Sequence, residues 1–112
     1  MSEDRPIFDP SAFRLTESEI ELTATARSLG SQHFAERASS YDVEARFPTE
    51  NYADLRDAGL LAVCVPREYG GLGASYRAYA VTAAEIGRYC GATALTWNMH
   101  VCSCLWTGDL AD

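Results

Sequence analysis

The sequence predicts an all-α domain, and three observations support this fold class. Apolar residues recur at helical spacings of three and four in two segments, 22–33 and 72–90. Side chains that cap helix N-termini, Thr16 and Ser75, stand at the starts of the helices predicted there. Only one short apolar run, 60–66, has the length of a strand, and a proline ends it. A chain of 112 residues suits one small domain of this kind.

The first helix is expected to begin after Thr16 and to run to about residue 39. Thr16 and Glu19 have the spacing of a capping box, in which the two side chains cap each other's backbone N–H groups. Gly30 weakens the middle of this helix without ending it. Residues 1–15 contain proline and aspartate and are expected to form a loose lead-in, so the domain proper is 16–112. The glutamates expected on the solvated face of this helix are Glu17, Glu19, Glu21 and Glu36.

A second, short helix is expected from Phe47-Pro48-Thr49 to a C-terminal cap at Gly59. The run LLAVCVP that follows is either a short strand or an extended crossing of the core. Next comes Gly70-Gly71-Leu72-Gly73, which raises the question of a phosphate-binding loop. A Walker loop needs a lysine, which the chain lacks, and a dinucleotide fingerprint needs G-x-G-x-x-G rather than GGxG. We therefore interpret these glycines as a turn with positive φ between two helices.

Two further helices are expected in the remainder of the chain. The first follows Ser75 and ends at Gly91, with Glu85 and Arg88 on its solvated side. The second lies within residues 89–108, which contain no Asp, Glu, Lys or Arg but too many polar residues for a membrane span. A helix that is uncharged all round is normally buried on all sides, so we expect other elements to enclose it. The stripe predicted for its core side consists of Leu95, Met99, Cys102 and Trp106.

Composition and charge argue against several classes of function. The net charge is −7, and the nine basic residues, all arginines, are scattered, so no nucleic acid is expected as a partner. The acidic N-terminus lacks an apolar segment, so we expect neither a signal nor a transit peptide, and a cytoplasmic location. The four cysteines are expected to be reduced thiols. His100, Cys102 and Cys104 are not expected to bind a metal, because on a helix Cys102 points away from the other two.

Two stretches resemble the N-terminal domain of the acyl-CoA dehydrogenase family. They are FPTENYADLRDAGLLAVCVPREYGGLGASY at 47–76 and VTAAEIGRYCGATALTWNMH at 81–100. The resemblance covers most of the chain from about Leu15 onward, and it implies an orthogonal helical bundle of the type found in that domain. The positions that match the family pattern are Phe47, Pro48, Gly59, Leu60, Leu61, Pro66, Glu68, Tyr69, Gly70, Gly71, Leu72 and Gly73.

The resemblance implies the N-terminal part of an FAD-dependent enzyme that oxidises the α,β C–C bond of an acyl-CoA by proton abstraction and hydride transfer. In that family a middle β domain and a C-terminal helical domain chiefly hold FAD, and the latter supplies the catalytic glutamate. We therefore expect no catalytic residue within residues 1–112, and we do not expect this chain to bind FAD alone. The whole enzyme would use an acyl-CoA substrate and an electron-transfer partner, and would form a homo-oligomer. A flavin monooxygenase or acyl-CoA oxidase of the same superfamily, or a stand-alone non-catalytic interaction module, are the alternatives.

The resemblance also implies where an acyl chain would lie. In the family, the helix corresponding to residues 93–104 forms one wall of the acyl-chain cavity. Carried over to this sequence, the expected wall is the side opposite the Leu95–Met99–Trp106 stripe, and the alternative is that this side packs in the core. His100 would offer a polar contact to a functionalised acyl group. The residues expected to form the wall are Trp97, His100, Val101 and Cys104.

Overall fold

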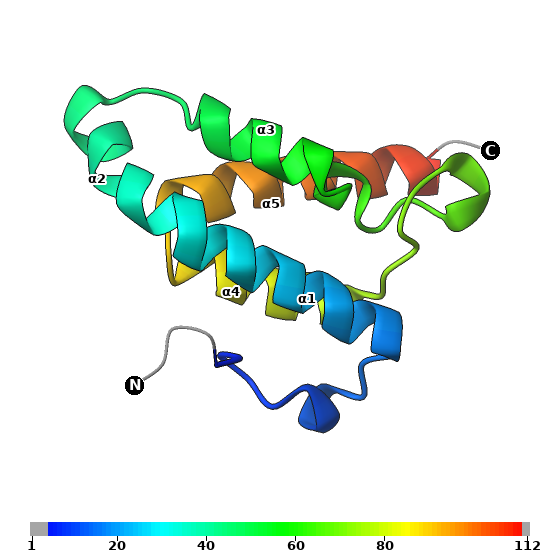
Figure 1. Ribbon diagram of the computed structural model, residues 1–112. Helices are drawn as coiled ribbons and strands as arrows, with labels where there is room; N and C mark the ends of the chain where they lie inside the picture. Colours follow the sequence, from blue (N-terminus) through cyan, green and yellow to red (C-terminus); the bar gives the residue numbers. More distant parts are fainter. Residues whose placement is uncertain (1–4, 111–112) are drawn as a thin grey trace.

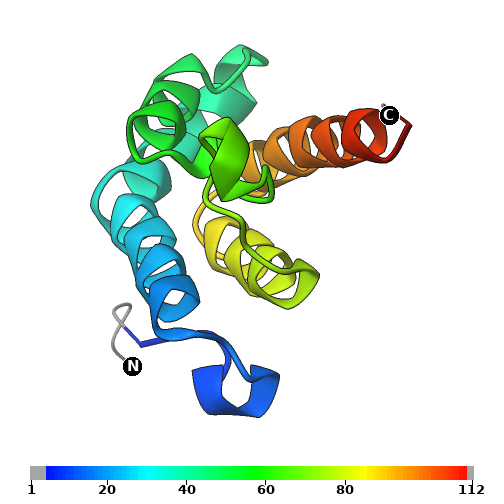
Figure 2. The same cartoon turned by 90° about the vertical axis from the view of Figure 1, so that its right-hand side faces the viewer.

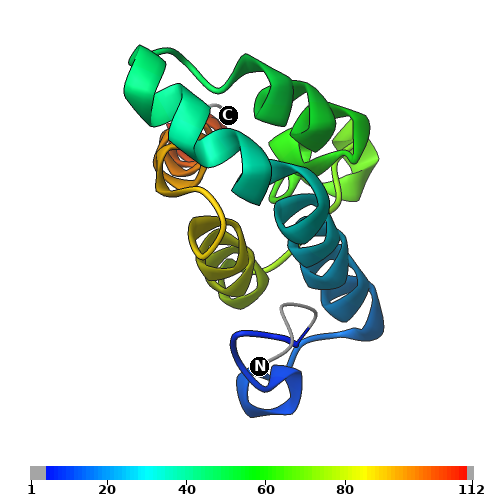
Figure 3. The ribbon, with the colours of Figure 1, turned by 60° about the vertical axis from the view of Figure 1, so that its left-hand side comes forward.

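The computed structural model describes residues 5–110, which form helices joined by short turns, with no strand in that range (Figure 1). The all-α prediction is thereby confirmed. Helix α4 lies between α1 and α5, and Figure 2 shows the three helices in this order from one end of the molecule. Helix α2 crosses the first turns of α5 (Figure 3). The five α-helices are α1 (Glu17–Leu29), α2 (Ala35–Glu44), α3 (Thr49–Asp57), α4 (Tyr76–Gly87) and α5 (Gly91–Leu110).

The predicted capping box begins α1. The Thr16 hydroxyl accepts from the Glu19 backbone N–H at 3.2 Å, and the Glu19 carboxylate accepts from the Thr16 N–H at 3.0 Å. Glu19 nevertheless differs from its expected place on the solvated face, because it is 8% exposed. Its second oxygen accepts from the Ser75 backbone N–H at 2.8 Å and so ties the start of α1 to the start of α4.

Helix α1 continues into α2 through a π-helical turn, η2 (Gly30–Phe34), so the helical segment ends at Glu44 rather than near residue 39. Position 30 requires glycine because the Tyr89 ring occupies the space that a larger side chain would need. A Cβ atom there would lie 2.0 Å from the Tyr89 ring. Gly30 therefore does not merely weaken the helix: it allows the residues after α4 to pack directly on the backbone.

Residues 59–74, which we call the glycine corner, connect α3 to α4 without a strand. Instead of the expected strand or extended crossing, they form two 3-10 turns, η3 (Leu60–Ala62) and η4 (Arg67–Tyr69). Gly59, Gly70 and Gly73 all have positive φ, as a turn requires. Every backbone N–H from Gly70 to Ala74 donates to a carbonyl within residues 62–67. The turn interpretation is confirmed, since the N–H groups that a phosphate would need are already used.

Two predictions about α4 are wrong. The helix ends at Gly87, and Gly91 begins α5 rather than ending α4. Glu85 is fully buried rather than solvated, because Arg27 and Arg88 donate to its two oxygens at 2.8 and 3.1 Å. The same carboxylate accepts from the Ile7 backbone N–H at 3.4 Å. Within the segment 1–15, expected as a lead-in, Ile7 is therefore attached to α4. The Ser75 cap is confirmed, since its hydroxyl accepts from the Ala78 N–H at 3.2 Å.

The core side predicted for α5 is also wrong. Leu95, Met99 and Trp106 are 62%, 62% and 71% exposed, whereas Trp97 and Val101 are buried with at most 1% exposed. The buried side packs on α4 and η3, and the opposite side is an apolar face open to solvent. Between residues 5 and 110, no helix combines the length and the apolar character that crossing a bilayer requires.

Candidate functional site

A groove of about 660 Å³ lies between the C-terminal half of α5 and the glycine corner. This volume is in the range of pockets that hold small molecules. Helix α5 contributes Val101 and Leu105, together with the polar side chains of His100, Ser103, Cys104 and Thr107. The opposite wall consists of the apolar side chains Leu61, Val63, Val65 and Pro66, beside Cys64 and Tyr69.

Two ring N–H groups hold α5 against the corner. The Trp97 indole Nε1–H donates to the Leu60 carbonyl at 3.0 Å. His100 Nε2 lies 2.8 Å from the next carbonyl, that of Leu61. Because a carbonyl oxygen only accepts, Nε2 must carry a proton. The two bonds fix α5 relative to η3, and with it the width of the groove.

The structure brings three of the four expected wall residues to this groove. His100, Val101 and Cys104 line it, and Cys104 Sγ lies 3.7 Å from His100 Nε2. Trp97 does not line it: its side chain is 0% exposed, and its ring lies 5.4 Å from that of Tyr79 in the core. The sequence interpretation missed the opposite wall, although the apolar run 60–66 was the signal for it.

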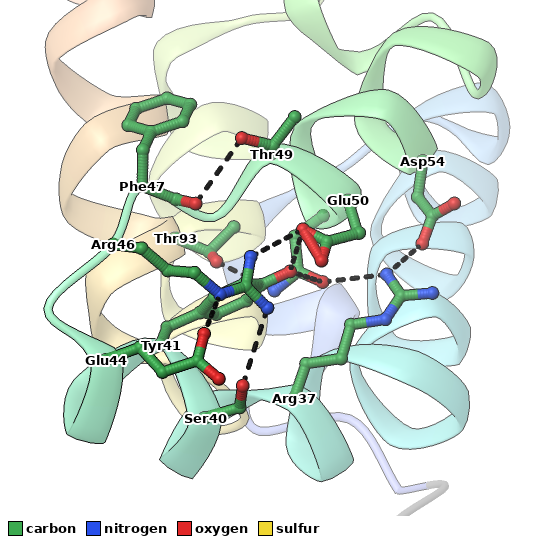
Figure 4. Close-up of polar contacts among 11 residues, drawn as sticks. Arg37, Ser40, Tyr41, Glu44, Arg46, Phe47, Thr49, Glu50, Asp54 and Thr93 are labelled. Atoms are coloured by element: carbon green, nitrogen blue, oxygen red, sulfur yellow. Dashed lines mark hydrogen bonds and ion pairs between the residues drawn. The ribbon is translucent and has the colours of Figure 1, made fainter.

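A cluster of polar side chains lies at the N-terminal end of α5, between α2 and α3 (Figure 4). Asn51 is fully buried; its amide donates to the Thr93 hydroxyl at 2.9 Å and its carbonyl accepts from Arg37 at 2.9 Å. Arg37 also pairs with Asp54 at 2.8 Å. Within residues 5–110 no buried side-chain nitrogen or oxygen atom lacks a hydrogen bond. These bonds connect α2, α3 and α5.

The cysteines of α5 point to different partners. Cys102 lies 3.9 Å from the Tyr79 hydroxyl, while Cys104 lies beside His100. Burial and the Cys102 hydrogen bond raise the pKa of Tyr79 to about 12. Burial likewise raises the pKa of the Cys64 thiol, and the nearby Glu19 carboxylate adds to this effect. In the part of the chain that the structure describes, no three His, Cys, Asp or Glu side chains are placed to hold a metal ion.

These features define a small helical domain that presents an apolar groove and uses its glycine-rich turn for its own hydrogen bonds. The chain belongs to the acyl-CoA dehydrogenase family, since the family model for the acyl-CoA dehydrogenase N-terminal domain matches residues 16–108.

Curated relatives agree with this assignment. The probable acyl-CoA dehydrogenase fadE25 of Mycobacterium leprae (strain TN) is 42% identical over 83 residues, which are 74% of this chain and 21% of that protein. The short-chain specific acyl-CoA dehydrogenase, mitochondrial, of Rattus norvegicus is 33% identical over 86 residues, 77% of this chain and 21% of that protein. The 3-sulfinopropanoyl-CoA desulfinase of Variovorax paradoxus is 33% identical over 78 residues, 70% of this chain and 20% of that protein. The chain thus spans about a fifth of the length of these relatives. No solved structure matches it.

Proposed function

We propose that this chain provides the helical N-terminal domain of an FAD-dependent acyl-CoA dehydrogenase, which oxidises the α,β C–C bond of an acyl-CoA thioester. We further propose that the groove between α5 and the glycine corner receives the acyl chain. The observation that carries this proposal is the apolar lining of the groove, in a domain whose family acts on acyl-CoA. Electron transfer to a partner protein and homo-oligomer formation are parts of the same proposal for the whole enzyme.

The groove would bind an acyl chain chiefly by removing methylene groups from water. Each buried methylene contributes about 0.8 kcal/mol. Val101 is only 1% exposed, so water does not penetrate the wall at this residue. The hydrogen bonds of Trp97 and His100 keep the opposite wall at a fixed distance from α5. The role of these residues is therefore to hold the chain and to exclude water from it.

We propose that FAD is held outside the described residues. The N–H groups of the glycine corner are used internally, and five arginines are paired with carboxylates: Arg27, Arg37, Arg46, Arg56 and Arg88. We therefore assign no residue of 5–110 to the flavin, which would supply the hydride acceptor when it is bound in the whole enzyme. We also assign no catalytic base. Glu85 is the buried carboxylate of α4, but two arginines occupy its oxygens.

Methyl-resolved NMR titration of the chain with an unsubstituted medium-chain acyl pantetheine thioester tests this proposal. Shifts should gather at Val101 and Leu105 on the groove and leave Leu95, on the opposite face of α5, unchanged. The variant Leu105→Ala should weaken binding, and Leu95→Ala is the matched control. Shifts centred on Leu95, or no saturable shift, would reject the groove as the acyl site.

Reduction of the whole protein's flavin by acyl-CoA, followed by its absorbance, separates the dehydrogenase from the alternatives. Reduction without oxygen and slow reoxidation by it are expected for a dehydrogenase. Rapid reoxidation would indicate the oxidase or monooxygenase, and a whole protein without flavin would indicate an interaction module.

A further inference from the structure

We propose that His100 makes this groove selective for acyl chains that carry a hydroxyl group. The inference rests on the proposed function, because it assumes that the groove takes an acyl chain. The imidazole ring makes its hydrogen bonds through Nε2, and the other ring nitrogen, Nδ1, is not used by them.

The tautomer of His100 is set by the glycine corner. Nε2 lies 2.8 Å from the Leu61 carbonyl, which can only accept, so the proton of the neutral ring resides on Nε2. Cys104 Sγ, at 3.7 Å from the same nitrogen, is compatible with this proton position, because sulfur is a weak acceptor. Nδ1 of the neutral ring is therefore a hydrogen-bond acceptor.

Nδ1 is also accessible. It has no hydrogen-bond partner among the residues that the structure describes. Since no fully buried side-chain nitrogen in that part of the chain lacks a partner, Nδ1 keeps some exposure. His100 is half-buried and lines the groove, so a ligand that fills the groove meets this ring.

The other polar side chains of the α5 wall have their protons engaged. The Ser103 hydroxyl donates to the Met99 carbonyl at 3.0 Å, and the Thr107 hydroxyl donates to the Ser103 carbonyl at 2.8 Å. Tyr69 is the hydroxyl of the opposite wall, and it is 76% exposed. The half-buried α5 wall thus offers a strong acceptor, Nδ1, and no free side-chain donor stronger than the Cys104 thiol.

A wall with one strong acceptor and no strong free donor complements a ligand group that donates a hydrogen bond. A hydroxyl on the acyl chain can donate to Nδ1, whereas an unsubstituted chain removes water from Nδ1 and puts nothing in its place. A carboxylate presents only acceptors and is repelled by a neutral Nδ1. A neutral hydrogen bond contributes about 0.5–1.5 kcal/mol net, which corresponds to about 2- to 10-fold in affinity.

The test uses the ¹⁵N-labelled chain, whose two histidines, His33 and His100, make the imidazole spectrum simple to assign. Long-range ¹H–¹⁵N correlation, at a pH where both rings are neutral, should show His100 protonated on Nε2. The chain is then titrated with pantetheine thioesters of one chain length: unsubstituted, ω-carboxylated, and hydroxylated at successive carbons. At least one hydroxyacyl thioester should bind about 2- to 10-fold more tightly than the unsubstituted one and should shift the Nδ1 resonance.

Three variants separate the possible causes. His100→Phe removes the acceptor and should bring the hydroxyacyl preference to about 1. His100→Gln can donate to Leu61 and still present an amide oxygen, so it should keep part of the preference. His33→Gln, away from the groove, should bind as the unmodified chain does.

Binding of all thioesters with equal affinity, a carboxylate preference, or a preference that survives in His100→Phe would overturn this inference and leave the acyl groove standing. Failure of every thioester to bind in the groove would instead reject the proposed function, and this inference with it.

Discussion

Replacing Trp97 by phenylalanine tests how α5 is attached to the glycine corner. The substitution keeps an aromatic ring beside Tyr79 but removes the indole N–H that donates to the Leu60 carbonyl at 3.0 Å. Leu60 is 0% exposed, so water cannot readily replace the lost donor. An unsatisfied buried carbonyl costs about 1–3 kcal/mol, and the smaller ring leaves a gap that adds to this cost. We expect Trp97→Phe to lower the free energy of unfolding by about 2–4 kcal/mol.

Urea unfolding followed by far-UV circular dichroism measures this loss without relying on the tryptophan that is removed. Trp106→Phe is the matched control, because that ring is 71% exposed on the same helix. Its effect should stay within about 0.5 kcal/mol, as for most surface substitutions. A typical domain has only about 5–15 kcal/mol of stability, so the two variants should be easy to tell apart. Equal midpoints for the two would refute the argument that the indole N–H holds α5 to the corner.

Three other predictions concern the glycine corner, Glu19 and the exposed face of α5. Gly71→Ala should destabilise the chain by about 1–3 kcal/mol in the same urea assay, because its Cβ would lie 2.1 Å from the Val65 carbonyl oxygen, whereas Gly108→Ala, with open space around it, should not. Burial alone would raise the pKa of Glu19, but hydrogen bonds from Thr16 and Ser75 outweigh it and lower the pKa below its ordinary 4.5. The stabilisation by Glu19 is therefore present above pH 4.5 and is lost as the pH falls through the lowered pKa. We expect the urea midpoint of Glu19→Gln to fall less steeply below pH 4.5 than that of the unmodified chain, and an equally steep fall would contradict this. The exposed apolar face of α5 should make the chain self-associate in sedimentation velocity, and Trp106→Gln should reduce this association, because Trp106 belongs to that face; an unchanged distribution of species would contradict this.

The features that the sequence predicted correctly depend on neighbours in the chain. The Thr16 capping box, the Ser75 cap and the positive φ of Gly59 and Gly70 follow from local backbone chemistry, which a few consecutive residues determine. The same locality separates a glycine turn from a phosphate loop, since the lysine of a Walker loop would follow the glycines directly.

The wrong predictions concern contacts between distant parts of the chain. Glu85 is a charged residue whose sequence pattern indicates a solvated face, and its burial depends on Arg27, which stands 58 residues earlier. The two walls of the groove differ in how far the sequence indicates them. The family resemblance draws attention to His100, Val101 and Cys104 on α5, and their role as an acyl wall stays a prediction. The opposite wall exists because two 3-10 turns fold the run 60–66 back against α5.

Apolar side chains lie on several sides of α5, and its one charged residue, Asp109, stands near its end. Burial of apolar side chains alone therefore does not determine the rotation of α5 about its axis, and its hydrogen bonds do. Thr93, Trp97 and His100 follow one another at spacings of four and three, which places them on one face, and they bond to Asn51, Leu60 and Leu61 respectively. Any rotation would break all three bonds at once and leave buried polar groups without partners. The polar contacts of α5 therefore fix the rotation of the helix about its axis. They determine which apolar side packs in the core and which side stays exposed and free to contact another surface.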